Sequence, residues 1–337
     1  MSLLRLDGHE ELAPFLDASD EEALRRLGRT TLIRIPGTGA EGRARLVSCL
    51  LHGNEDSGLR AVLELLRSGV RLEFDLWVLI GNVEAATVDG LFGHRYLDGQ
   101  EDFNRVWGST DVVTPQRESA GTILGILRAV PLEAALDLHN TTGESPPHAI
   151  VPVGWREAEA LAATCCELVL RWSLDAGTLM EALSPRCPSV AVECGIAGVS
   201  SGREFAAGVL RRFLDAQLTD PRRPERLYET AERVEVLDGI RFAFREELDA
   251  ELDLALRPDL DAHNFGLLPA GTRMGRVRGT RMPLRAVDMA GADVTDGLFN
   301  IDGDGDLLLI RDVTPVMITR AVTQTQRDCY FYAAVRI

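Results

Sequence analysis

Two histidines and one glutamate stand where two apolar runs of the sequence end. His52 and Glu55 follow the run at residues 46–51, and His139 follows the run at residues 134–138. Two imidazoles and one carboxylate form the ligand set of a catalytic zinc, which keeps its remaining coordination position for water or substrate. We therefore predict that His52, Glu55 and His139 bind one zinc ion per chain.

A third apolar run, at residues 189–192, ends in Glu193. Ligands of open α/β sheets bind outside the carboxyl ends of the strands, so a strand end here would bring Glu193 close to the predicted metal ligands. A carboxylate in that place can accept the proton of a water that the metal activates. We therefore predict that Glu193 is a general base.

Other polar residues near these runs have two interpretations each. Asp137 lies two residues before His139 on the same face of its strand, so it is a candidate partner for the ligand imidazole or an acid at the sheet edge. Arg105 can form a fork for a substrate carboxylate with Asn104 as a neutral donor, or it is a solvated loop residue. Four further residues are interpreted as structural: Arg95, Tyr96, His148 and Arg186.

Three short motifs match known signatures in the wrong local context. Residues 37–42 fit the dinucleotide pattern G-x-G-x-x-G, which must open a helix, but here a second strand follows, so a β-hairpin turn is expected. Residues 198–202 fit the nucleophile elbow, yet the strand should end near residue 193, and residues 201–204 fit a helix capping box. Residues 302–306 resemble a calcium loop without its glycine and final glutamate, so a hairpin turn is expected.

The composition narrows the class of protein. The chain has 337 residues, 45% hydrophobic and 26% charged, which is ordinary for a folded protein with a sizeable core. Its net charge of −16 argues against nucleic acid and anionic membrane as partners. No lysine occurs, so Schiff-base chemistry on lysine is excluded. The sequence shows no signal peptide and no apolar run of membrane-spanning length, and its six cysteines lack paired spacing, so a cytoplasmic location is expected.

Strands alternate with helices over about the first 200 residues, which predicts a largely parallel sheet covered on both faces. Strands are expected at residues 30–35, 45–51, 74–80, 134–138, 149–153 and 190–193. Helices are expected at residues 9–28, 59–67, 119–128, 157–172 and 203–218. Within the first of these, Ser19 begins a cap at residues 19–22, and Gly28 is the expected stop. The proline-rich residues 221–224 mark a boundary between a catalytic domain at 1–220 and a small all-β domain at 225–337.

Four motifs in order carry a family resemblance: His52-Gly53-Asn54-Glu55, Asp102-x-Asn104-Arg105, Asp137-Leu138-His139 and Val192-Glu193-x-Gly195. They resemble the succinylglutamate desuccinylase/aspartoacylase family of zinc carboxypeptidase-like amidohydrolases. The similarity runs over residues 45–215 and continues faintly into the β tail. The resemblance implies an α/β three-layer domain with a mixed sheet between helices. It also implies His52, Glu55 and His139 as zinc ligands, Glu193 as general base, and Asn104 with Arg105 as binders of the substrate carboxylate.

The resemblance implies hydrolysis of the amide bond of a small N-acyl amino acid. Residues 137–142 look like the aspartoacylase branch, but Glu84 stands where that branch carries a substrate-binding arginine, which argues against acetylaspartate. Two alternatives stay open: a carboxypeptidase-like metallopeptidase, and a non-catalytic zinc-binding module on the same fold. The presence of Glu193 favours an enzyme. A homo-oligomer is compatible with the sequence.

Overall fold

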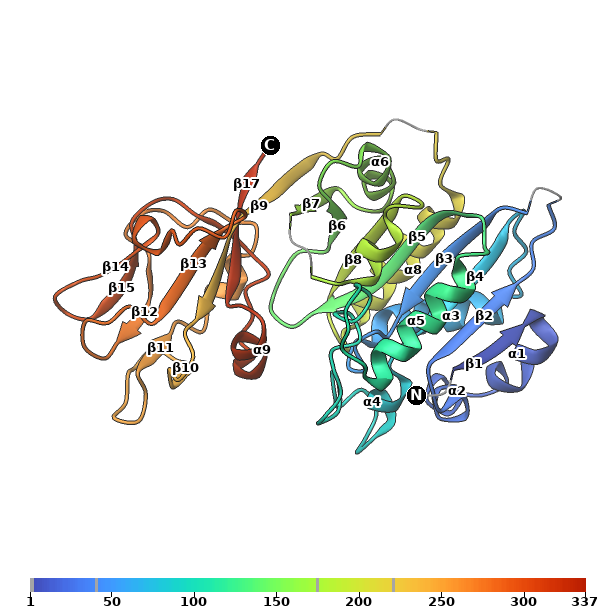
Figure 1. The fold of residues 1–337 in the computed structure, drawn as a ribbon, viewed down its shortest axis with the longest axis horizontal. Coiled ribbons are helices and arrows are strands. Elements are labelled where there is room, and N and C mark those ends of the chain that lie inside the picture. The colour runs from blue at the N-terminus through green and yellow to red at the C-terminus, as the bar shows by residue number, and fades with distance from the viewer. Residues whose placement is uncertain (1–2, 40–41, 174–175, 220–221) are drawn as a thin grey trace. The chain divides into compact units, whose positions relative to one another are not determined.

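The protein is described by a computed structural model at residues 3–39, 42–173, 176–219 and 222–337, and it divides into two compact units (Figure 1). The first unit takes most of the chain up to Arg226. The second takes Leu227–Ile337 together with the short stretch Thr141–Pro146. Strand β7 (Leu168–Trp172) crosses the division. The domain boundary at residues 221–224 stays a prediction, and nothing in the sequence indicated that Thr141–Pro146 would belong with the second unit.

The first unit is built on a mixed sheet with the strand order β1-β2-β4-β3-β5-β8-β6. Its strands are β1 (Leu4–Asp7), β2 (Thr31–Ile35), β3 (Ala44–Cys49), β4 (Asp75–Ile80), β5 (Leu132–Thr141), β6 (His148–Pro152) and β8 (Ser189–Ile196). The central strand β3 is parallel to both β4 and β5, whereas β2–β4 and β6–β8 are antiparallel. Every residue of β3 is buried, as expected for a strand that is covered on both faces.

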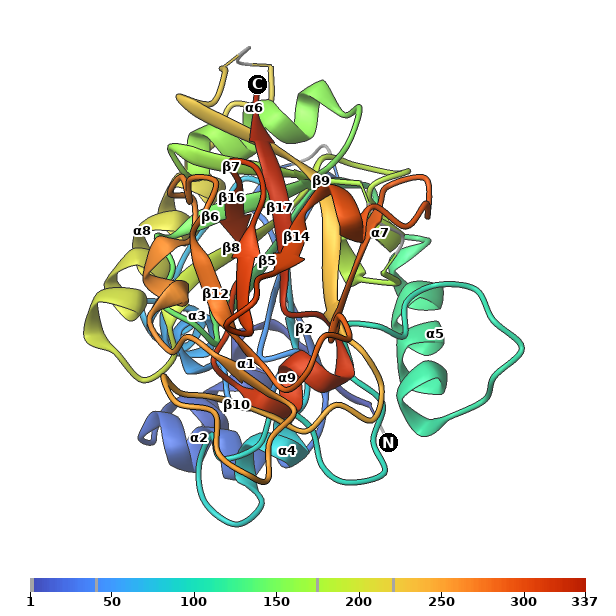
Figure 2. The same cartoon turned by 90° about the vertical axis from the view of Figure 1, so that its left-hand side faces the viewer.

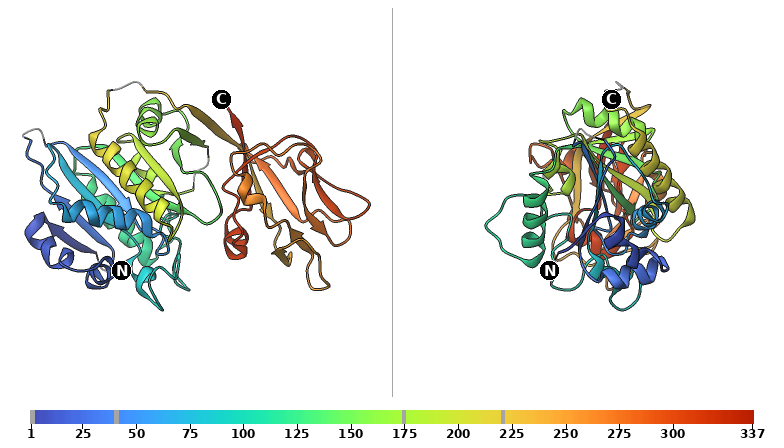
Figure 3. Two further views of the ribbon diagram at one scale, coloured as in Figure 1. Left: turned by 180° about the vertical axis from the view of Figure 1, so that it is seen from behind. Right: turned by 90° about the vertical axis from the view of Figure 1, so that its right-hand side faces the viewer.

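Helices cover both faces of this sheet. They are α1 (Gly8–Leu16), α2 (Asp20–Leu27), α3 (Asp56–Arg67), α4 (Val83–Thr87), α5 (Pro115–Leu127), α6 (Arg156–Cys165), α7 (Leu179–Leu183) and α8 (Ser200–Asp215). Helices α3 and α8 lie side by side over one face, and α5 lies on the other (Figures 2 and 3). Leucine and isoleucine side chains of α5 and α7 pack with apolar residues of β3, β4 and β5 in one core. The α/β three-layer expectation is confirmed.

The second unit is almost entirely β structure. Its strands are β9 (Arg226–Val236), β10 (Phe242–Phe244), β11 (Leu254–Leu256), β12 (Arg273–Val277), β13 (Leu284–Asp288), β14 (Phe299–Ile301), β15 (Asp306–Leu309), β16 (Thr314–Val316) and β17 (Phe331–Arg336). One sheet has the order β10-β11-β12-β15-β14, and β9 pairs separately with β13 and β17. Short 3₁₀ turns and the helix α9 (Val322–Arg327) complete it. A large apolar core, which includes the fully buried Tyr330 and Phe331, holds these strands together.

The predicted bounds of the helix that follows Ser19 and the predicted turn at residues 302–306 are confirmed. Ser19 accepts a hydrogen bond from Glu22 N at the start of α2, and Gly28 ends that helix in the left-handed conformation with φ 64°. The acidic residues 302–306 join β14 to the antiparallel β15 as a hairpin turn. All six cysteines are free and buried. Within the described residues, no helix is both long and apolar enough to cross a bilayer.

Three local predictions are wrong. The helix expected at 157–172 ends at Cys165, and β7 follows; its buried residues Leu168, Val169 and Leu170 form a run that suits either element. Residues 37–39 do not lead into a hairpin, because β4 lies between β2 and β3. Helix α8 begins at Ser200 without a side-chain cap, so residues 201–204 are not a capping box.

The glycines at 37–39 are explained by close backbone approach. A Cβ on Gly37 would lie 2.4 Å from the carbonyl carbon of Phe74, and one on Gly39 would lie 2.2 Å from the carbonyl oxygen of Glu73. The segment therefore packs against the chain that enters β4. Residues 40–41 of the same motif lie outside the described residues.

Candidate metal centre

Adjacent parallel strands bring the predicted ligands together. Strands β3 and β5 are neighbours in parallel register, so their carboxyl ends lie at the same edge of the sheet. His52 stands in the turn after β3, and Glu55 directly precedes α3. His139 belongs to the carboxyl end of β5. Residues that are 84 positions apart in sequence thus meet at one edge.

The turn that carries His52 has an unusual backbone. Leu50 has φ 58°, which is uncommon for a residue other than glycine, and its side chain is completely buried. A Cβ on Gly53 would lie 2.6 Å from Ala86 N and 2.7 Å from His94 O. Glycine at position 53 is therefore required by close approach and not by its own φ. Such constrained turns cluster at functional sites.

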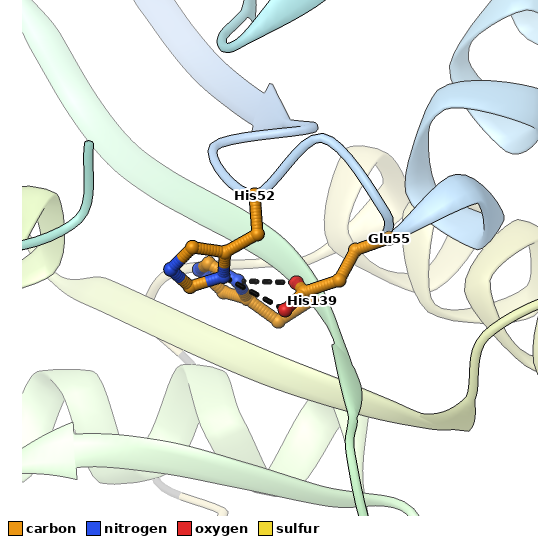
Figure 4. Close-up of side chains that lie close together, drawn as sticks. All are labelled: His52, Glu55 and His139. Atoms are coloured by element: carbon orange, nitrogen blue, oxygen red, sulfur yellow. Dashed lines mark hydrogen bonds and ion pairs between the residues drawn. The ribbon is translucent and has the colours of Figure 1, made fainter. Parts of the chain in front are cut away.

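The ligand atoms of His52, Glu55 and His139 converge (Figure 4). His52 Nδ1 lies 2.7 Å from Glu55 Oε1, and His139 Nδ1 lies 2.8 Å from Glu55 Oε2. One potential ligand atom from each residue lies within 4.8 Å of the others, and all three residues are buried. The donor set of two imidazole nitrogens and one carboxylate fits a zinc ion.

A second carboxylate stands behind each imidazole. His52 Nε2 lies 2.9 Å from Asp102 Oδ1, and His139 Nε2 lies 2.7 Å from Asp137 Oδ2. A carboxylate at Nε2 favours the tautomer with its proton there, which leaves the lone pair of Nδ1 directed at the ligand cluster. Asp137 is itself hydrogen-bonded by the Ser48 hydroxyl. The structure thus places Asp137 against the imidazole that the sequence suggested.

The charges of this cluster shift each other's pKa. Burial alone would raise the pKa of Glu55, but His52 and His139 hold it below its usual range. Burial would lower the pKa of His139, but Asp137 and Glu55 raise it well above the ordinary value. Burial would raise the pKa of Asp102, but His52 and Arg95 hold it well below its ordinary value. Such opposed shifts among buried groups are typical of functional sites.

Glu193 lies in β8, paired with His148 of β6. It is 9% exposed, and its Oε2 finds no hydrogen-bond partner among the described residues. Burial raises the pKa of Glu193 to about 7, while the imidazole of His139 acts to lower it. A carboxylate that is uncommitted and titrates near neutral pH is suited to accepting and returning a proton.

Asn104 and Arg105 lie on the loop before α5. Asn104 is buried; its Nδ2 lies 3.2 Å from His139 Nε2, and its Oδ1 accepts a hydrogen bond from Leu179 N. Arg105 is half-buried, and its Nη1 donates to the carbonyl of Asn104 at 3.0 Å. The structure therefore brings Asn104 to the cluster directly and places Arg105 next to it in the chain.

The sequence analysis interpreted Arg95 as structural and gave Asp102 no role. Arg95 Nη1 lies 3.1 Å from Glu55 Oε1, and its Nη2 lies 3.2 Å from Asp102 Oδ2 and 2.7 Å from His52 Nε2. Glu84, in contrast, accepts a hydrogen bond from Gln100 Nε2 at 3.0 Å. Arg95 lies in an irregular stretch without periodicity, so only its position in the same loop as Asp102 and Asn104 could have singled it out.

Comparison with known proteins agrees with this geometry. Residues 41–202 match the family model described as the succinylglutamate desuccinylase/aspartoacylase catalytic domain. Residues 41–202 belong to this family. The match includes all three converging ligands, Glu193 and the loop with Asn104 and Arg105. No curated protein matches the chain significantly.

Solved structures share the fold of this chain. A succinylglutamate desuccinylase from Vibrio parahaemolyticus is 17% identical, with a TM-score of 0.61; the match covers 91% of this chain and 86% of that one. One from Chromobacterium violaceum is 19% identical, with a TM-score of 0.55 and coverage of 91% and 88%. Murine aminoacylase 3 is 20% identical, with a TM-score of 0.53 and coverage of 87% and 95%. The likeness extends over both units and establishes the fold.

Proposed function

We propose that this protein is a zinc-dependent hydrolase that cleaves the amide bond of a small N-acyl amino acid. The observation that carries the proposal is the convergence of His52 Nδ1, His139 Nδ1 and the Glu55 carboxylate. The family membership supports amide hydrolysis, because the similar structures include succinylglutamate desuccinylases and an aminoacylase. The expected stoichiometry is one zinc per chain.

Each residue has a distinct part in this reaction. Zinc, when bound by His52, Glu55 and His139, supplies Lewis-acid polarisation of the acyl carbonyl and makes water more acidic. Glu193 accepts a proton from the attacking water and returns it to the leaving amine nitrogen. Asp102 and Asp137 hold the imidazoles in the ligating tautomer, since each accepts from an Nε2.

Arginines provide the recognition of a substrate carboxylate. Arg105, with Asn104 beside it, is the binder that the family resemblance implies, and a guanidinium can bind a carboxylate by two parallel hydrogen bonds. Arg95 is a second candidate. A cation at Glu55 would weaken the bond from Arg95 Nη1 to that carboxylate and would make this nitrogen more available to a substrate anion, while the bonds of Arg95 to Asp102 would remain.

The test compares metal-free and zinc-loaded protein on a panel of N-acetyl and N-succinyl amino acids, with short peptides as the comparison class. Metal-dependent release of the free amino acid from an acyl amino acid is the expected result. Release of a carboxy-terminal residue from peptides alone would favour the metallopeptidase. Stoichiometric zinc without either reaction would favour the non-catalytic module.

A further inference from the structure

The buried amide of Asn140, next to His139, joins three segments of the site. Its Oδ1 accepts a hydrogen bond from Ser57 N at 3.1 Å. Its Nδ2 donates to Ser57 Oγ at 3.0 Å and to the carbonyl of Gly195 at 2.7 Å. The residue is only 3% exposed, so these bonds replace hydration that the amide loses on burial.

The three segments are those that carry the reacting groups. Asn140 directly follows His139, and its own backbone N–H donates to Glu55 Oε2 at 3.0 Å. Ser57 lies in the first turn of α3, two residues after Glu55. Gly195 lies in β8, two residues after Glu193. One side chain thus bonds next to both Glu55 and Glu193.

The end of β8 is constrained at two further points. Gly195 has φ 91°, a conformation that side-chain-bearing residues rarely adopt, and a Cβ there would meet no other atom within 4 Å. Glycine is therefore present for its backbone conformation. Three residues later, Gly198 N donates to Asp56 Oδ1 at 2.7 Å, and Asp56 is paired with Arg60 and Arg203. The segment that follows Glu193 is therefore bonded at Gly195, through Asn140, and at Gly198, through Asp56, to the start of α3.

Only an asparagine satisfies these bonds at this length. The site needs one acceptor for Ser57 N and a donor pair for Ser57 Oγ and Gly195 O, which the carboxamide provides. An aspartate keeps the acceptor but has no donor for the Gly195 carbonyl. A serine is too short to reach both segments at the observed separations.

We infer that Asn140 is a positioning residue that fixes the β8 exit, and with it Glu193, relative to the metal ligands. The expected effect on turnover rests on the proposed function, whereas the hydrogen bonds that Asn140 forms with Ser57 and Gly195 do not. A displacement of about 1 Å between reacting groups can cost about 10²-fold in rate, so these bonds should affect turnover more than binding.

The kinetic arm uses Asn140→Asp and Gly195→Ala, with Thr295→Val as the control. Thr295 is a buried hydroxyl that bonds Ala286 N in the second unit, so its loss perturbs stability without touching this site. We expect both test variants to keep zinc, to lose about 10–100-fold in kcat and to change KM less than threefold. The control should keep kcat. Gly195→Ala adds no charge, so it decides the matter if Asn140→Asp fails to fold.

The second arm needs no substrate. Amide hydrogen exchange at residues 195–199 should accelerate at least tenfold in both test variants, with exchange at 190–192 unchanged. Normal exchange and full kcat in the folded, zinc-loaded variants would overturn the inference, and so would loss of zinc as the primary defect. If the wild-type protein hydrolyses nothing, the proposed function fails, and the exchange arm alone decides whether Asn140 holds the β8 exit.

Discussion

Two buried polar clusters of this protein differ in how completely their hydrogen-bonding groups are paired. In the second unit, Asp261 accepts from Glu144 N and pairs with Arg320 at 2.9 Å. Asn264 bonds the carbonyl of Glu144 and both the N–H and the carbonyl of Ile318. This cluster holds the stretch Thr141–Pro146 almost entirely through backbone groups. In these contacts, each hydrogen-bond donor is therefore paired with an acceptor.

The candidate metal centre in the first unit instead gathers several acids in one place. Glu55, Asp102, Asp137 and Glu193 are four buried or largely buried carboxylates around two imidazoles, and Glu193 Oε2 has no partner within the described chain. A fully satisfied polar cluster stabilises a fold, whereas a cluster with perturbed pKa values and an uncommitted acid is suited to a ligand or a reaction. The comparison predicts that substitutions at the candidate metal centre reduce zinc binding or kcat, whereas substitutions in the second unit's cluster reduce the free energy of unfolding.

The largest effect concerns the metal. The variant with both His52→Ala and His139→Ala should lose nearly all zinc, because it keeps one of the three ligands. Metal analysis of the folded protein measures this loss. Asn264→Ala should retain about one zinc per chain. Full zinc retention in the double histidine variant would place the site elsewhere.

Glu193→Gln should separate chemistry from stability. The amide keeps the shape but cannot accept the proton, so kcat should fall by roughly 10²-fold or more with zinc retained. Asn264→Ala should do the reverse and cost about 1–3 kcal/mol of unfolding free energy, because it leaves buried backbone groups unsatisfied. Steady-state kinetics and urea unfolding measure the two effects. An active Glu193→Gln enzyme would assign the base role to another group.

The pH dependence of stability should reveal Glu193 in the metal-free protein. Burial raises the pKa of Glu193 from 4.5 to about 7, so the folded state binds its proton more tightly than the unfolded state. Its stabilising contribution is present below pH 4.5 and is lost as the pH rises to about 7. Over this window the wild type should lose about 3 kcal/mol more unfolding free energy than Glu193→Gln. Parallel pH profiles for the two proteins would contradict the raised pKa.

The smallest effect distinguishes an arginine that binds substrate from one that stabilises the fold. Arg105→Lys keeps the charge but not the paired hydrogen bonds. The transition-state stabilisation that kcat/KM measures should therefore fall by about 1.5–3 kcal/mol. The loss should shrink for a substrate analogue whose carboxylate is an amide. Arg320→Lys, beside buried Asp261, is the matched control and should leave kcat/KM unchanged. Equal losses on both substrates would mean that Arg105 supports its loop.

The sequence by itself determined the elements that depend on local chemistry. Ser19 and Gly28 bound α2 through cap bonds within a few residues, and the turn at 302–306 joins neighbouring strands. The apolar runs before His52, His139 and Glu193 also identified three strands, because burial on both faces demands such runs. The presence of these strands and the residue types of the candidate ligands were therefore predictable. The strand ends were not, because β5 and β8 continue past His139 and Glu193 to Thr141 and Ile196.

Only the tertiary structure decided which distant segments meet. The insertion of β4 between β2 and β3, the strand β7 in place of the end of a helix, and the contact of Arg95 with Glu55 depend on long-range pairing. Asn140 illustrates the reason. Its partners Ser57 and Gly195 lie 83 and 55 residues away, so no local pattern records the bonds. Sheet order and register alone bring those backbone groups within reach of one amide.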